Sequence, residues 1–187
     1  MIMKTHYLTS FLVGVLVLAC NSSEPVDEKV AKATEMRSRI QRMEDSLFNA
    51  SMFEQRNAQA LLDVYKAYAT SLPLDSMAPE FLFRAAGVAR SMKDPQQSIF
   101  LYDRIVRDYP GWRKLPDTYY LKAFVIDTDL GHKGEAQAAY TYVINNFPDH
   151  PFAEQARLAI ANLNFTDEEL IARFKAMEGD TTATTGK

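Results

Sequence analysis

One short stretch of the sequence brings acidic and imidazole groups close enough together to suggest chemistry. Asp127, Asp129 and His132 lie within six residues of one another. Carboxylates and imidazoles bind divalent cations, so this stretch is a candidate site for metal-dependent hydrolysis. On a helix, however, positions 127 and 129 point about 200° apart, which is poor geometry for shared ligation. We favour the alternative, an acidic helix end followed by His132 in a turn, where the helix dipole favours an imidazolium.

No other part of the sequence carries a recognisable catalytic or cofactor motif. There is no glycine-rich phosphate loop, no GxGxxG and no GxSxG. Cys20 is the only cysteine, which excludes a disulfide or a thiolate metal cluster within the chain. The 24 acidic residues outnumber the 21 basic ones, and no basic stripe suits a nucleic acid. We therefore expect no enzymatic activity, no cofactor, no metal and no nucleic-acid partner.

The residues before Cys20 have the layout of a secretory signal. Lys4 precedes the uncharged apolar run 11–19 (FLVGVLVLA), and a small residue, Ala19, ends that run. The run is shorter than the roughly 20 residues that a membrane-spanning helix needs. An apolar residue, a spacer, a small residue and then Cys (VLAC) resembles the lipobox of bacterial lipoproteins. In that family the Cys thiol is alkylated with diacylglycerol, and the amine freed by cleavage is then acylated.

This resemblance implies that residues 1–19 are a signal peptide and that Cys20 is lipidated. The alternative is an ordinary signal peptide with a chance Cys near its end. Residues 20–27 are small, polar and acidic, and we expect them to form a flexible tether. Two or more acyl chains anchor a protein stably. Asn21 stands where an Asp would imply inner-membrane retention in enterobacterial lipoproteins, so the resemblance implies the outer membrane, on its periplasmic face or at the cell surface.

The rest of the chain contains an internal repeat. Three segments end in Pro, with spacings of 37 and 38 residues, and each has a Tyr eight residues earlier: Tyr65 and Pro73, Tyr102 and Pro110, Tyr140 and Pro148. A second Pro then opens the next segment, at Pro79, Pro116 and Pro151. Periods of 20–50 residues indicate a repeat architecture. Each repeat is predicted to be two helices, and the three Tyr residues are predicted to be core.

These repeats resemble tetratricopeptide (TPR) units. The matching residues are Tyr120, Gly131, Ala136, Tyr140 and Pro148 in one unit, and Leu82, Ser98, Tyr102 and Pro110 in the unit before it. The resemblance extends to the TPR lipoproteins of outer-membrane barrel assembly and to tol–pal-linked TPR proteins. It implies an all-α fold, a short TPR-like solenoid of antiparallel helical hairpins over residues 79–177. Phe124 departs from the pattern, because the family usually has a small residue there.

The two ends of the array are predicted as follows. Residues 28–73 form an N-terminal helical hairpin, either a degenerate TPR-like unit or a short coiled coil. A seam with steps of three and four residues allows both: Ala33, Met36, Ile40, Met43, Leu47 and Ala50. At the other end, residues 151–163 form a helix, and a capping box at Thr166–Glu169 starts a last one. Residues 178–187 are expected to be a disordered tail.

The TPR resemblance also implies a concave groove that takes peptides or helices of other proteins. Carried over by repeat position, its lining is Glu80, Phe83, Arg90, Leu121, Val125 and Asp129. Trp112, beside Arg113 and Lys114, is a further partner contact or, alternatively, packs between hairpins. The sequence thus predicts a membrane-anchored interaction scaffold of the cell envelope. The alternative is a peptide- or solute-binding lipoprotein that uses the same groove. The oligomeric state is left open.

Overall fold

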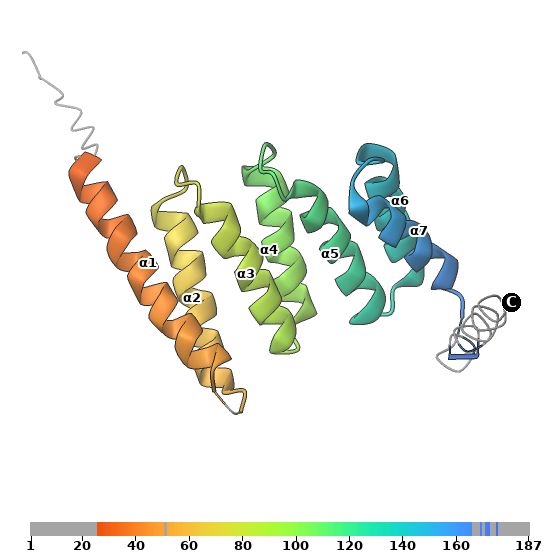
Figure 1. Ribbon diagram of the computed structural model, residues 1–187, viewed down its shortest axis with the longest axis horizontal. Helices are drawn as coiled ribbons and strands as arrows, with labels where there is room; N and C mark the ends of the chain where they lie inside the picture. Colours follow the sequence, from red (N-terminus) through yellow and green to blue (C-terminus); the bar gives the residue numbers. More distant parts are fainter. Residues whose placement is uncertain (1–25, 51, 166–168, 170, 173–174, 176–187) are drawn as a thin grey trace, which may run out of the picture.

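The computed structural model describes residues 26–50, 52–165, 169, 171, 172 and 175 of the 187-residue chain. Within this part there are no strands, and the predicted all-α fold is confirmed. The helices are α1 (Val26–Phe48), α2 (Gln55–Ser71), α3 (Ala78–Ser91), α4 (Pro95–Asp108), α5 (Leu115–Thr128), α6 (Lys133–Asn146) and α7 (Pro151–Asn162). They follow one another in a single elongated row, and each packs against the next (Figure 1).

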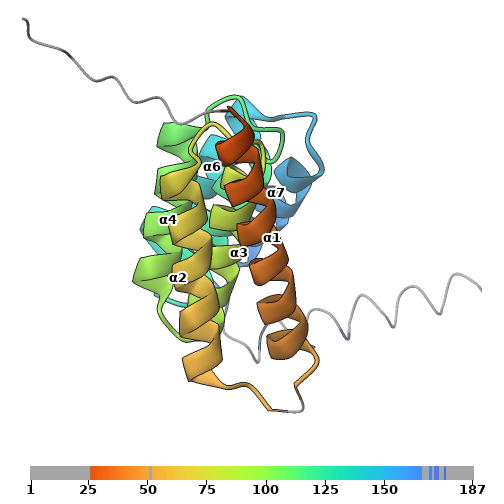
Figure 2. The same ribbon diagram turned by 90° about the vertical axis from the view of Figure 1, so that its left-hand side faces the viewer.

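The helices form antiparallel hairpins: α1 with α2, α3 with α4, and α5 with α6. Seen from the end of the row, α2, α4 and α6 lie to one side of α1, α3 and α7 (Figure 2). A lone hairpin cannot bury both of its apolar faces, so the hairpins stack into a TPR-like solenoid. In α1, Ala33, Ile40 and Leu47 are buried, as expected if it is the first helix of a hairpin. Ala50, the last position of the predicted seam, is exposed beyond the end of the helix.

The internal repeat is visible in how the second helix of each hairpin ends. Leu72, Tyr109 and Phe147 follow α2, α4 and α6 with φ of −131, −133 and −134° and ψ of 57, 54 and 53°. Each donates its backbone N–H to the carbonyl four residues earlier. The predicted Pro comes directly afterwards in all three cases. The helical conformation is disfavoured for a residue that precedes Pro. One local rule therefore ends three helices in the same way.

The turns inside the hairpins follow from single residues. Gly131 has φ of +68°, a left-handed conformation that glycine adopts after a helix end without the Cβ penalty of other residues. Between α3 and α4, Lys93 takes the left-handed conformation with φ of 64°. Asp94 then caps α4, because its carboxylate accepts the Gln97 backbone N–H at 2.9 Å.

The core lies between stacked hairpins and is built from aromatic rings set among alanines. Tyr65, Tyr102 and Tyr140 are at most 3% exposed, so the predicted core role of this stripe is confirmed. Phe81 of α3 lies against two rings of α2, with centroid distances of 5.6 Å to Tyr65 and 4.6 Å to Tyr68. Such ring pairs stabilise a core beyond the area they bury. The first four helices share one hydrophobic cluster, and α5–α7 share a second.

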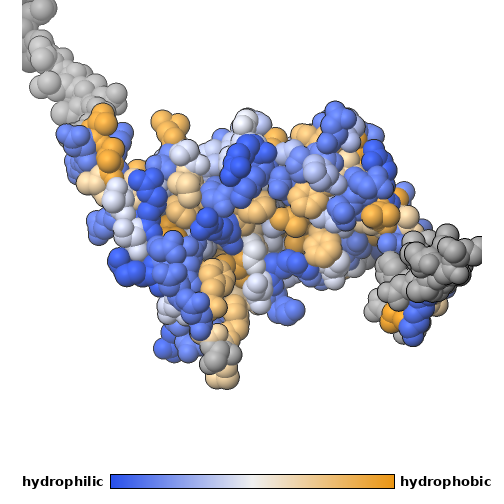
Figure 3. All heavy atoms as spheres, in the orientation of Figure 1, coloured by the Kyte–Doolittle hydropathy of each residue, from blue (hydrophilic) through white to orange (hydrophobic). Residues whose placement is uncertain are grey.

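Several predictions fall wholly or partly outside the described residues. They concern the signal peptide, Cys20, the capping box apart from Glu169, and the tail. The tether was predicted to reach residue 27, but α1 begins at Val26, so its last two positions are helical. No described helix is both long enough and apolar enough to cross a membrane. On the face shown in Figure 3, apolar residues gather at the beginning of α1 and at the tip of the α1–α2 hairpin.

Candidate functional site

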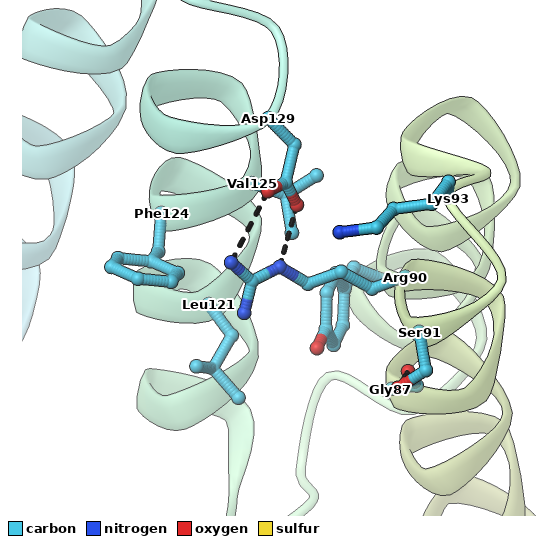
Figure 4. A pocket seen from close by; sticks show the side chains of 9 residues that line it. Gly87, Arg90, Ser91, Lys93, Leu121, Phe124, Val125 and Asp129 are labelled. Carbon is cyan, nitrogen blue, oxygen red and sulfur yellow. Dashed lines mark hydrogen bonds and ion pairs between the residues drawn. The ribbon is translucent and has the colours of Figure 1, made fainter. Parts of the chain in front are cut away.

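A groove between α3 and α5 brings together four of the seven predicted partner-binding residues. Arg90, Leu121, Val125 and Asp129 line it, and its volume is about 430 Å³. α3 and α5 are the first helices of neighbouring hairpins, so their facing sides form one wall each (Figure 4). The remaining lining residues are Gly87, Ser91, Lys93, Tyr102 and Phe124. Four of the predicted residues therefore share one groove, and Glu80, Phe83 and Trp112 do not line it.

The rim of the groove is a charged bridge between α3 and α5. The Arg90 guanidinium donates two hydrogen bonds to the Asp129 carboxylate, at 2.5 and 3.2 Å. It also lies 4.6 Å from the centroid of the Phe124 ring, a cation–π arrangement. The hydrogen bond from Arg90 holds the pKa of Asp129 below its ordinary value, and nearby Lys93 acts in the same direction. Two cations and one anion leave the rim with a formal charge of +1.

The floor of the groove is apolar. Leu121 and Phe124 are half-buried and reach the groove, so they remain available for contact. Val125 is only 1% exposed and belongs to the core cluster of the first four helices. Val125 thus lines the groove with very little exposed surface, and its contact with a partner stays a prediction.

Five lining residues were not among the predicted groove residues, and the sequence carried a signal for two of them, Gly87 and Phe124. Gly87 lies inside α3, and a Cβ placed on it would meet nothing within 4 Å, so the absence of a side chain leaves the groove wall open. A glycine inside a helical pattern is a signal that could have been used, because such a residue usually has a packing or functional reason. Phe124 was noted as a departure from the TPR pattern. Its ring lies beneath Arg90.

The predicted contacts Glu80, Phe83 and Trp112 form a neighbouring cluster outside the groove. The ring centroids of Phe83 and Trp112 are 5.5 Å apart, and Lys114 Nζ lies 5.4 Å from the Phe83 centroid. Lys114 Nζ also donates to Glu80 at 2.8 Å. Trp112 thus packs between hairpins, the alternative considered for it. These side chains hold the α4–α5 loop against α3.

An ion-pair network continues from this cluster towards α1. Arg84 donates to Glu80 at 3.2 Å and to Glu44 at 2.8 Å, and the Tyr65 hydroxyl donates to Glu44 at 2.5 Å. Burial alone would raise the pKa of Glu80, but the hydrogen bonds from Lys114 and Arg84 outweigh it and lower that pKa. Burial and the hydrogen bond to Glu44 raise the pKa of Tyr65. The network connects the first hairpin to the second.

The candidate metal ligands do not form a joint site. Asp127 accepts a hydrogen bond from the Tyr140 hydroxyl at 3.2 Å, and Asp129 is paired with Arg90. His132 Nδ1 lies 3.3 Å from Glu135 Oε2. Across the part of the chain that the structure describes, no three His, Cys, Asp or Glu side chains form a group that could hold a metal ion. The acidic helix end is therefore the better description of this stretch.

No protein-family model matches the chain, and no curated protein matches it. The function of the groove is therefore inferred from its own residues.

Proposed function

We propose that this chain is a lipid-anchored lipoprotein of the bacterial cell envelope that acts as an interaction scaffold. Its groove between α3 and α5 binds an extended peptide segment or a helix of another envelope protein. The groove carries this proposal, since it combines half-buried Leu121 and Phe124 with a charged rim. The TPR resemblance and the repeated helix ends support it. The anchor is Cys20, and the outer membrane is its proposed location.

The chemistry of the groove favours a particular kind of partner segment. Leu121 and Phe124 offer an apolar surface, and Arg90 and Lys93 exceed the single carboxylate of Asp129 in charge. An apolar side chain with an acidic group beside it satisfies both features. Aromatic residues and Arg are enriched among the residues that dominate binding energy in protein interfaces. The groove thus suits an anchor residue and an adjacent carboxylate.

The groove also supports a second candidate function, capture of a small solute or peptide. Its volume of about 430 Å³ lies in the range of roughly 300–1,000 Å³ that is usual for small-molecule sites. A saturable ligand would raise the melting temperature of the protein, because it binds the folded state. A protein partner would instead be seen as a covalent adduct in the crosslinking experiment below.

Crosslinking in cells tests the scaffold directly. A photoreactive residue replaces Leu121 in the groove or, as a control, Phe100, which is 57% exposed on α4. We expect one dominant adduct from position 121 that is absent from position 100. Equal adducts, or none from folded and lipidated protein, would contradict the scaffold function. Mass spectrometry of the same protein tests the anchor, which requires a lipid-modified Cys20 that is lost in Cys20→Ser.

A further inference from the structure

A second apolar surface lies at the beginning of α1, away from the groove. Three large aliphatic side chains are unusually open there: Val26 is 77% exposed, Val30 57% and Leu74 99%. Val26 and Val30 lie one turn apart on α1, and Leu74 is in the loop between α2 and α3. Figure 3 shows apolar surface both at this end of α1 and at the neighbouring loop. We call Val26, Val30 and Leu74 the end patch.

The end patch surrounds an apolar groove of about 350 Å³. The first turns of α1 form one wall, and residues 71–75 form the other. Buried Ala33 and Leu72 lie at its base, and an ion pair between Arg37 and Asp75, at 3.7 Å, lies at its inner end. Single exposed apolar residues are normal on protein surfaces. Three exposed aliphatic side chains around one apolar groove form a larger apolar surface, whose contact with water is unfavourable.

The position of the end patch in the chain indicates what covers it. Val26 is six residues after Cys20, and a chain spans at most about 3.5 Å per residue, or roughly 20 Å in total. A lipid anchored at Cys20 therefore keeps this end of the array within about 20 Å of the bilayer. Other exposed apolar residues, Phe48, Met52 and Phe53, lie at the opposite end of α1. The short tether thus keeps the beginning of α1, and not its Phe48 end, next to the bilayer.

Resting on the proposed lipid anchor, we infer that the end patch inserts into the interface of the phospholipid bilayer. Val26, Val30 and Leu74 then lie among the headgroups and upper acyl chains, and the array is held in one orientation relative to the membrane. Aliphatic side chains are stabilised when they leave water for this region. The groove between α3 and α5 begins one hairpin further along the array, which leaves it accessible to a partner.

The balanced charges around the end patch indicate that its contact with the membrane is apolar rather than electrostatic. Asp27 and Glu28 lie beside Lys29 and Lys32 in the first turns of α1, so their formal charges cancel. Arg37 is paired with Asp75. Membrane binding through a polybasic segment would require an excess of Lys and Arg, which is not present in these turns. Insertion should therefore occur equally well in vesicles of zwitterionic lipid.

Fluorescence quenching by lipid tests the end patch on the lipidated full protein. Leu74→Cys places an environment-sensitive dye at the patch, and Phe100→Cys places the same dye on α4. The thiol of a lipidated Cys20 is blocked, so each protein has one reactive thiol. In phosphatidylcholine vesicles with brominated chains we expect quenching of at least twofold at position 74 and none at position 100. Val30→Glu should reduce the quenching at position 74, and Gln96→Glu should not.

Each other result overturns the inference in a recognisable way. Equal quenching at positions 74 and 100, with mass spectrometry showing a lipidated Cys20, would leave the anchor intact and refute the end-patch contact. A dye at position 74 that is shielded from iodide but not quenched by lipid, together with chemical crosslinks between copies, would assign the patch to a second copy of the chain. An unmodified Cys20 would refute the anchor, and the inference with it.

Discussion

Gly87 provides a sharp prediction because it serves the groove at the expense of helix stability. It lies inside α3, where glycine is less favourable than alanine by about 0.8–1.0 kcal/mol. A Cβ at this position meets nothing within 4 Å, so no steric cost offsets the gain from Gly87→Ala. We therefore expect Gly87→Ala to raise the free energy of unfolding by about 0.5–1 kcal/mol. For a chain of this size, each kcal/mol of added stability raises the melting temperature by about 2–4 °C.

The measurement is urea unfolding followed by circular dichroism, supported by a thermal melt. Gly131→Ala is the matched control, because the same substitution there meets a φ of +68° in equally open space. An alanine in the left-handed conformation costs about 1–2 kcal/mol, so Gly131→Ala should destabilise the protein. The two variants should thus change the free energy of unfolding in opposite directions. A neutral or destabilising Gly87→Ala would refute the reasoning that α3 is a regular helix with an open wall at this residue.

Three further predictions concern the network, the rim and the floor of the groove. Tyr65→Phe should lower the free energy of unfolding by about 0.5–1.5 kcal/mol in urea, because buried Glu44 loses its hydroxyl donor. Arg90→Gln should move the pKa of Asp129 up towards its ordinary value in a carboxyl NMR titration, since the Arg90 hydrogen bond lowers it. The stabilisation from Asp129 is present above the ordinary Asp pKa and is lost as pH falls through the lowered one. Val125→Ala should cost about 2 kcal/mol, because its methyl groups are buried.

Each of these predictions has a control and a contrary outcome. Tyr119→Phe removes only an exposed hydrogen bond of 3.4 Å, so an equal loss there would contradict the importance of the Glu44 network. Asp108 is paired with Arg107 outside the groove, and its titration should not change in Arg90→Gln. Leu121→Ala should cost less stability than Val125→Ala because Leu121 is half-buried, and the reverse order would contradict the described floor.

Local rules made most of the helical array predictable. A Pro that follows a helix end, a Gly in a left-handed turn and an Asp before Pro95 each act within a few residues, so the sequence shows their consequences directly. The Tyr stripe was predictable for a related reason. One side chain per repeat at a constant distance from the helix end must face the same interior. These features determine where helices begin and end.

The details of the groove depend on contacts that are distant in the sequence. Arg90 and Asp129 are 39 residues apart, and Glu44 and Arg84 are 40 apart. Repeat position placed Arg90 and Asp129 on facing helices but could not show that they pair with each other. It also placed Val125 in the lining of the groove but could not show that only 1% of this residue is exposed there. The exposed fraction depends on how α5 packs against its neighbours, which sequence pattern alone does not supply.

The most direct test of the scaffold is to fill the groove and measure the loss of its partner. Gly87→Trp adds a ring to the groove wall, and Gly134→Trp adds the same ring to α6, where space is also open. Both are combined with the photoreactive residue at Leu121 in cells, after circular dichroism confirms the fold. The account predicts that Gly87→Trp abolishes the adduct and Gly134→Trp retains it. An adduct that survives Gly87→Trp in a folded protein would contradict binding in the groove between α3 and α5.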